Sequence, residues 1–445
     1  MNKKFSIFTT ATFTLFLFTV SLAVYADSGI KEINVDGLRV IIKSTPKDVI
    51  SARLFVIGGT ANYPLDKQGI ESAALNTALN GGTTSKSKNE FKTEAEKIGT
   101  SFDYSSSLDY SQMSMTCIKP FWDKSWALFA DAIMNPSFDQ NEFDLIKEQM
   151  VSNAKQQEED PDAALERLAN GFAFKGRSYE KDPNGTSESL SKLTSANTKT
   201  YYNSTIGKAR CFLVVVGNLP EADIIAKVKA TLAKLPGGSG AKPESRFVIT
   251  KGAENIVDRD IATNYLCGIM SSATLASPDG IPMMMAMAIM YDRFFVELRT
   301  KRSLSYAPAA YINTSAITSP YSQVYISTDS PKKSIQVMVD LLNEIKRDGF
   351  KPEELVNKKE GFLTRYLMGL ETSDAQAQAL GVWTIRGNWK MYDEFVQRVN
   401  STTLKDLNRV MDQNTNAIIW TYLGKKADIT TSDFKQTEVY KNKPY

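Results

Sequence analysis

The sequence contains no histidine among its 445 residues. Without histidine, a chain cannot form a Ser-His-Asp or Cys-His catalytic unit, nor a zinc site with histidine ligands. Any chemistry must therefore use carboxylate, lysine, tyrosine, serine or arginine side chains, or it must take place on another chain.

Cysteine is also scarce. Cys117, Cys211 and Cys267 each lie inside an apolar, strand-like run, far apart in the chain. The odd count and the wide spacing favour buried free thiols over disulfides, and they argue against a thiolate metal site. We therefore expect no metal and no cofactor in this chain.

Neither sign of charge is in large excess, with 53 Lys and Arg against 50 Asp and Glu. This balance gives no reason to expect binding to nucleic acid or to an anionic membrane. Lys3 and Lys4 precede an apolar run that ends in small residues before Asp27, which is typical of a cleaved export signal. We expect residues 1–26 to be this signal, with no membrane anchor, and the mature protein to be periplasmic or secreted.

Hydrophobic patterns predict a mixture of strands and helices that occurs twice. Strand-like alternation surrounds the turn Asp36-Gly37, and a stretch of small residues from Ile70 to Leu79 has helical spacing. Gly69-Ile70 is repeated as Gly280-Ile281 at an offset of 211, and Phe138 and Glu142 are repeated at an offset of 212. The same order of elements recurs, so we predict two homologous α+β domains, each a mostly antiparallel sheet covered by helices.

The most linker-like stretch is rich in proline and glycine and begins at Pro236. It predicts an N-terminal domain over 27–236, a linker over 237–250 and a C-terminal domain over 251–445.

Several motifs resemble the pitrilysin/insulinase-type zinc peptidases, the inverzincins, and more narrowly the short two-domain type related to processing peptidases. They are the hairpin at 35–40, Gly58-Gly-Thr60, Lys67-Gln-Gly-Ile70, Gly81-Gly-Thr83 and the duplicated halves. The resemblance covers essentially the whole mature chain. It implies a helix carrying His-x-x-Glu-His, in which two histidines bind zinc and the glutamate activates water, and a third ligand, a Glu, on a later helix.

This sequence departs from that pattern at every metal position. Counting back from Gly82-Thr83, the histidine positions fall on Ala73 and Thr77 and the glutamate position on Asn76. The distant ligand falls near Asn153 or Ala154. A shift of one residue does not supply a histidine, so we predict a non-peptidase homologue that hydrolyses no peptide alone.

One other family pattern is retained. Leu298-Arg299, Leu304 and Tyr306 match the Leu-Arg-x-x-x-x-Leu-x-Tyr segment whose Arg and Tyr face the zinc across the cavity in the family. Tyrosine is a neutral donor for an oxyanion, and arginine supplies permanently charged donors. On residue types alone, the same two residues also fit a solvated helix end and a half-buried strand position.

A serine-rich stretch, 101–107, occupies the place of the family's strand that pairs with extended substrate. Ser105 and Ser106 are its candidate substrate-binding residues, because serines expose an edge without a hydrophobic surface. An ordinary sheet strand fits these residues too.

The resulting hypothesis is a metal-free subunit of an exported peptidase. Arg299 and Tyr306 would bind substrate and stabilise the oxyanion for a homologous partner chain that carries zinc and cleaves peptides or unfolded polypeptides. A catalytically inert peptide-binding or scaffold protein, as a homodimer or within a larger complex, is the alternative.

Overall fold

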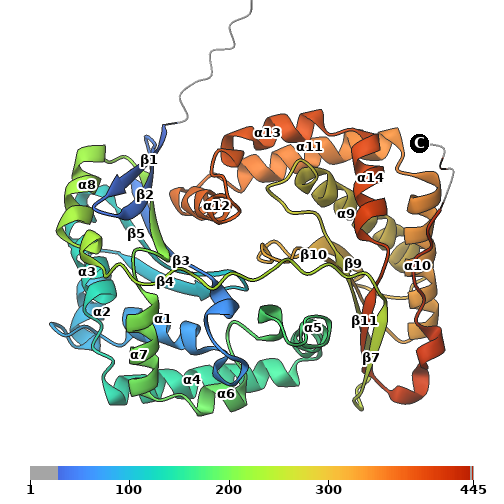
Figure 1. Ribbon diagram of the computed structural model, residues 1–445, viewed down its shortest axis with the longest axis horizontal. Coiled ribbons are helices and arrows are strands. Elements are labelled where there is room, and N and C mark those ends of the chain that lie inside the picture. The colour runs from blue at the N-terminus through green and yellow to red at the C-terminus, as the bar shows by residue number, and fades with distance from the viewer. Residues whose placement is uncertain (1–28, 441–442, 444–445) are drawn as a thin grey trace, which may run out of the picture.

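The computed structural model describes residues 29–440 and 443, so the expected export signal at 1–26 lies outside the described residues. The chain forms two halves that lie side by side, with the N-terminal half at left and the C-terminal half at right in Figure 1. Among the described residues, no helix is both long enough and apolar enough to cross a bilayer.

Each half contains one mixed sheet. The first has the order β1-β2-β6-β3-β5-β4 and the second the order β7-β11-β8-β10-β9. In each sheet one neighbouring pair is parallel, β2 with β6 and β7 with β11, and the other pairs are antiparallel. The strands are β1 Ile30–Val35, β2 Leu38–Ser44, β3 Val49–Ile57, β4 Ser101–Ser106, β5 Tyr110–Ile118, β6 Cys211–Gly217, β7 Ala253–Asp258, β8 Asn264–Ser271, β9 Ala309–Ile312, β10 Tyr321–Thr328 and β11 Ile419–Gly424.

The helices lie between the strands in the chain, singly or in longer runs such as α10 to α14 between β10 and β11. The apolar faces of α3 and α10 pack in the cores of their own halves, where they bury Phe129 and Leu342 completely. The helices are α1 Ile70–Asn80, α2 Lys88–Lys97, α3 Trp122–Met134, α4 Gln140–Glu159, α5 Pro161–Ala173, α6 Ser187–Ser191, α7 Ser195–Thr205, α8 Glu221–Ala230, α9 Gly280–Phe294, α10 Pro331–Asp348, α11 Pro352–Met368, α12 Ser373–Ile385, α13 Met391–Ser401 and α14 Leu404–Asn414. This arrangement confirms the predicted two-part α+β fold.

Local sequence signals explain several element boundaries. Asp36 and Gly37 both have positive φ, as a two-residue type I′ turn between β1 and β2 requires. Pro161 occupies the first turn of α5, and the Asp160 side chain accepts a hydrogen bond from the Ala163 N–H. The three cysteines are free and buried, as expected from their spacing.

The two halves exchange a helix. From the N-terminal half, α5 packs on β8 and β11 of the second sheet, and α12 packs on β3 and β6 of the first. Gly381 of α12 lies so close to the ring of Phe55 that an added Cβ would come within 2.0 Å of it. Each half therefore completes the core of the other, and the hydrophobic core continues across the boundary.

A buried carboxylate fastens the two halves at a second place. The carboxylate of Asp109, at the β4–β5 turn, accepts hydrogen bonds from the backbone N–H of Ile317 and from both the N–H and the hydroxyl of Thr318. The Tyr179 hydroxyl donates to the same carboxylate. Burial raises the pKa of Asp109, although these hydrogen bonds oppose the increase.

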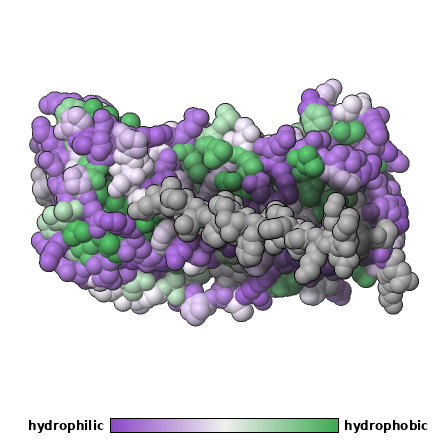
Figure 2. All heavy atoms as spheres, turned by 90° about the horizontal axis from the view of Figure 1, so that it is seen from above, coloured by the Kyte–Doolittle hydropathy of each residue, from purple (hydrophilic) through white to green (hydrophobic). Residues whose placement is uncertain are grey.

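The surface seen from above is hydrophilic over most of its area, and hydrophobic residues gather in separate patches (Figure 2). Exposed large apolar side chains include Leu367 and Met368 at the end of α11.

Candidate functional site

Helix α1 occupies the position of the family's metal-binding helix. Ala73 and Thr77 are buried, and the Thr77 hydroxyl donates to the Ala73 carbonyl within the helix. The neighbouring pair, Ser72 and Asn76, lies within hydrogen-bonding reach of the Tyr104 hydroxyl on β4. Ser72 and Asn76 are thus the α1 side chains directed towards β4. They lie one residue before Ala73 and Thr77, the positions obtained by counting back from Gly82-Thr83, and neither is a metal ligand.

Glu71, the one carboxylate on α1, belongs to a buried network. Its carboxyl accepts hydrogen bonds from the Asn62 amide at 2.9 Å, from the Tyr201 hydroxyl at 2.5 Å and from the Ser111 hydroxyl. Burial raises the pKa of Glu71. Because its oxygens are occupied within the core, we interpret Glu71 as a structural residue.

The position of the distant metal ligand is equally unsuited to zinc. Asn153 is exposed on α4 and accepts a hydrogen bond from Gln149, and Ala154 is buried. Within residues 29–440 and 443, no three His, Cys, Asp or Glu side chains gather closely enough to hold a metal ion. The residues of this chain therefore do not fit the family's zinc, and no catalytic step can be derived through it here.

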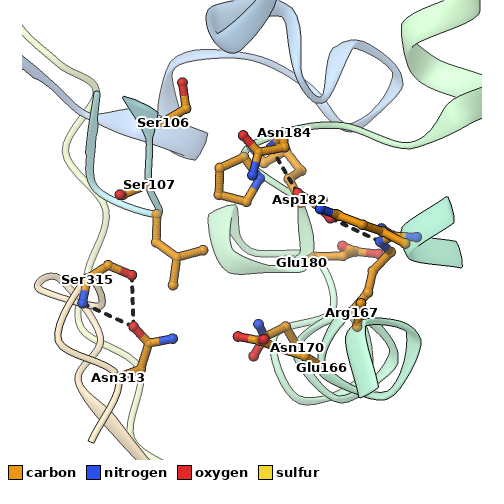
Figure 3. A pocket seen from close by; sticks show the side chains of 15 residues that line it. Ser106, Ser107, Glu166, Arg167, Asn170, Glu180, Asp182, Asn184, Asn313 and Ser315 are labelled. Atoms are coloured by element: carbon orange, nitrogen blue, oxygen red, sulfur yellow. Dashed lines mark hydrogen bonds and ion pairs between the residues drawn. The ribbon is translucent and has the colours of Figure 1, made fainter. Parts of the chain in front are cut away.

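A polar cavity of about 320 Å³, which we call the first cavity, opens between the two halves (Figure 3). The end of β4, helix α5 and the segment 180–184 line it from the N-terminal half, and Asn313 and Ser315 line it from the C-terminal half. Glu166 and Asn170 of α5 project together at its lower edge in Figure 3.

Charge in the first cavity is partly compensated. Arg167 donates to the Asp182 carboxylate at 3.0 Å and lies 3.6 Å from a carboxylate oxygen of Glu158. Glu166 forms no ion pair with a residue that the structure describes, and burial followed by the nearby Asp182 carboxylate raises its pKa. The cavity can therefore offer hydrogen bonds to a polar backbone, together with acidic side chains.

Strand β4 forms a free edge of the first sheet. The Ser107 N–H donates to the Tyr110 carbonyl, which sets the alternation of bonded pairs between β4 and β5. By this alternation, the backbone groups of Phe102, Tyr104 and Ser106 face away from β5. An extended peptide can pair with such an edge.

The two serines predicted to bind substrate differ in their surroundings. The Ser105 hydroxyl accepts a hydrogen bond from the Gln112 amide at 2.9 Å, so its side chain is engaged within the sheet. Ser106 lines the first cavity, and its hydroxyl is buried without a hydrogen-bond partner among the described residues. Of the two, Ser106 is the better placed to contact a molecule in the cavity.

Arg299 and Tyr306 come together at the end of α9. The helix continues as a π-helical turn, Phe295–Thr300, a rare geometry that often marks functional sites. From this turn the Arg299 guanidinium donates to the Tyr306 carbonyl at 3.0 Å and lies 4.8 Å from the centre of the Phe295 ring. The Tyr306 side chain is 87% exposed. Neither residue is among those lining the first cavity.

Comparison with known proteins now identifies the family. A family model described as "Insulinase (Peptidase family M16)" matches residues 39–187, and one described as "Peptidase M16 inactive domain" matches residues 192–362. This chain belongs to peptidase family M16. The resemblance inferred from the motifs is therefore confirmed.

Relatives of the chain carry two kinds of name. "Uncharacterized zinc protease YmxG" of Bacillus subtilis is 22% identical over 404 residues, which cover 85% of this chain and 93% of the relative. "Non-peptidase homolog YmxG" of Helicobacter pylori is 21% identical over 301 residues, which cover 66% and 68%. The absence of histidine places this M16 member with the non-peptidase homologues.

Solved structures share the fold. A Helicobacter pylori protease superposes with a TM-score of 0.82 at 15% identity, covering 88% of this chain and 99% of that one. The periplasmic protease PqqL of Escherichia coli gives a TM-score of 0.73 at 14% identity, covering 96% of this chain and 49% of PqqL.

Sequence reasoning did not identify the α5 residues of the first cavity. Glu166 and Asn170 lie four apart on one face of a helix, a spacing shared by many solvated helix surfaces. The offset of 212 pairs Glu166 with Gln378 and Asn170 with Val382 of α12. This difference between the two repeats was the signal in the sequence that could have identified the α5 residues.

Proposed function

We propose that this M16 chain is the metal-free subunit of an exported two-chain zinc peptidase and supplies Arg299 and Tyr306 to a homologous, zinc-bearing partner. The observation that carries the proposal is the asymmetry within the chain. Every metal position is occupied by a residue unsuited to zinc, while the Arg/Tyr pair is retained, with Arg299 on a π-helical turn and the exposed Tyr306 beyond the end of that turn.

The chemistry of the pair suits this role. The exposed Tyr306 hydroxyl is a neutral donor able to hydrogen-bond an oxyanion, and the remaining N–H donors of Arg299 can bind a substrate carbonyl. Loss of one donor to a developing oxyanion commonly lowers kcat by about 10²–10³-fold. A contribution of this size would favour retention of the pair even after the metal site had disappeared.

Substrate would be a peptide or an unfolded segment. The free edge of β4 can add an extended strand, and Ser106 has an unpaired hydroxyl beside the first cavity. The acidic groups of this cavity favour a substrate with basic or neutral side chains near it.

A two-chain assembly has support among the relatives. One relative, 20% identical over 345 residues, is named as the beta subunit of the mitochondrial-processing peptidase of Blastocladiella emersonii. The periplasmic protease PqqL shares the fold, which is consistent with export to the periplasm, as the apolar N-terminal run suggests.

The test is reconstitution. The chain should be purified alone, mixed with an exported homologue from the same organism that carries His-x-x-Glu-His, and assayed with a quenched fluorescent peptide library. We expect zinc only in the partner, a stable heterodimer by light scattering, and activity of the mixture well above the sum of the separate chains. A homodimer that neither binds the partner nor changes its activity would contradict the proposal and favour the inert peptide-binding alternative.

A further inference from the structure

A larger cavity, of about 660 Å³, lies between α12 and the pair α9 and α11, and Tyr110 of the first sheet also lines it. We call it the second cavity. Most of its wall is apolar or aromatic and includes Met284, Tyr366, Val382, Trp383 and Phe395. A volume of this size and an apolar lining with few polar groups are typical of sites for small molecules.

The aromatic part of this wall is well ordered by its own contacts. The rings of Tyr366 and Phe395 stack with their centres 3.9 Å apart, and Phe362 stacks on Phe395 at 6.4 Å. The Tyr366 hydroxyl donates to the Tyr392 carbonyl at 2.7 Å, which fixes its ring. The rings that form this wall are therefore held in place by contacts with one another and with the Tyr392 backbone.

Charge in the second cavity has one sign. Its lining includes Arg365 and Arg386 but no Asp or Glu, and neither arginine forms an ion pair with any residue that the structure describes. Arg386 donates to the Thr314 carbonyl at 2.9 Å and lies 4.6 Å from the centre of the Trp383 ring. The Nε of Arg386 is buried and has no hydrogen-bond partner in the part of the chain that the structure describes.

Arg386 is partly buried, and its guanidinium has lost part of its hydration without gaining an anion. One carbonyl and one ring offset this cost only in part. Burial lowers the pKa of Arg386 to about 10, so the group still carries its charge at neutral pH. An anion bound at Nε would supply the missing acceptor, and a carboxylate matches the fork of an arginine.

The apolar lining of the second cavity limits the chemical nature of the rest of the ligand. A peptide would bring backbone N–H and C=O groups against a mostly apolar wall that offers few hydrogen-bond partners for them. A hydrocarbon chain has no such groups and gains free energy from burial against the aromatic wall.

We propose that the second cavity binds a medium- or long-chain fatty acid, with the carboxylate on Arg386 and the hydrocarbon chain along the wall formed by Trp383, Tyr366 and Phe395. This ligand site is separate from the Arg299–Tyr306 pair and does not depend on the proposed peptidase role.

The experiment is calorimetric titration of the full mature chain with laurate, and with lauramide as the uncharged counterpart. We expect saturable one-to-one binding of laurate. The affinity for lauramide should be lower than that for laurate by about tenfold or more, since a charge-assisted hydrogen bond is lost. Arg386→Gln should weaken laurate binding by about tenfold or more, while Arg347→Gln, at an exposed arginine paired with Asp348, should leave it unchanged.

A second variant guards against a folding defect in Arg386→Gln. Ala379→Phe keeps the arginine but fills part of the cavity, and it should also weaken laurate binding, with unchanged near-ultraviolet circular dichroism. Absence of saturable laurate binding to the wild-type chain would overturn the proposal, as would equal binding of lauramide or undiminished binding by Arg386→Gln. Tighter binding of the acid N-acetyl-Leu-Phe than of laurate would show that the inferred occupant is wrong.

Discussion

The two cavities occupy equivalent places in the duplicated fold, yet their linings are opposite in character. At the offset of 212, Ala163 on α5 corresponds to Ala375 on α12, and Glu166 corresponds to Gln378. The next two pairs, Arg167 with Ala379 and Asn170 with Val382, change from polar to apolar.

This difference shows how a duplicated fold can separate its roles. The equivalent helices α5 and α12 each pack on the sheet of the opposite half. Helix α5 forms one wall of a polar cavity, and α12 forms one wall of an apolar cavity. The two helices have the same place in their repeats. A few side chains on one face of each helix determine whether its cavity suits a peptide or a hydrocarbon. The following predictions test whether the polar residues of the first half serve stability or binding.

The largest effect on stability should come from Glu71, whose counterpart at the offset of 211 is Pro282. Glu71→Ala leaves the Asn62, Ser111 and Tyr201 donors buried without their acceptor, so the free energy of unfolding should fall by about 3 kcal/mol. Urea denaturation followed by circular dichroism measures this loss. Glu71→Gln keeps the shape and one acceptor oxygen and should lose about 1 kcal/mol. A loss below about 1 kcal/mol in Glu71→Ala would mean that the network is not structural.

A smaller effect tests the exchanged helix α12. Gly381→Ala forces a methyl group against the buried Phe55 ring and should lower the free energy of unfolding by about 1–3 kcal/mol. Gly361→Ala, within α11 and with no atom near the added methyl, should raise it by about 0.5–1 kcal/mol. Thermal unfolding of both variants measures the expected decrease in stability for Gly381→Ala and the expected increase for Gly361→Ala. If Gly381→Ala were neutral, the contact between α12 and the first sheet would be looser than described.

The smallest effect concerns pH and the first cavity. Burial and the Asp182 carboxylate raise the pKa of Glu166 above its ordinary value of 4.5. The folded state therefore binds this proton more tightly than the unfolded chain. The stability that Glu166 contributes is present below about pH 4.5 and is lost as pH rises through its folded-state pKa.

Glu166→Gln isolates this contribution, because glutamine is the residue at the equivalent position in α12. Between pH 4.5 and 7.5, the wild-type chain should lose stability relative to Glu166→Gln in parallel urea titrations. A constant difference between the two chains across this range would show that Glu166 is fully hydrated.

Much of the fold followed from local patterns in the sequence. The sequence has Asn135-Pro136 between α3 and α4 and Asp160-Pro161 between α4 and α5, and proline ends a preceding helix. Ser330 directly precedes α10, and serine is a residue that commonly caps a helix. However, its side chain forms no cap, and the Ser330 N–H instead donates to the Thr328 hydroxyl.

Long-range features could not be predicted in the same way. Nothing in the α5 and α12 sequences says that each packs on the sheet of the other half, because an apolar helical face fits either sheet. The pairing of β6 between β2 and β3 also depends on contacts far apart in the chain. The motif did predict Arg299 and Tyr306 as a pair, but not the π-helical turn that carries Arg299.

The most direct test of the central claim is the turnover of the reconstituted mixture when the chain carries Tyr306→Phe. Tyr311→Phe is the matched control, since Tyr311 is a partly exposed tyrosine on β9. If Tyr306 completes a site on the partner, kcat should fall by about 100-fold with Tyr306→Phe and stay within about twofold with Tyr311→Phe, with unfolding unchanged in both. Wild-type turnover by the mixture containing Tyr306→Phe would contradict the account.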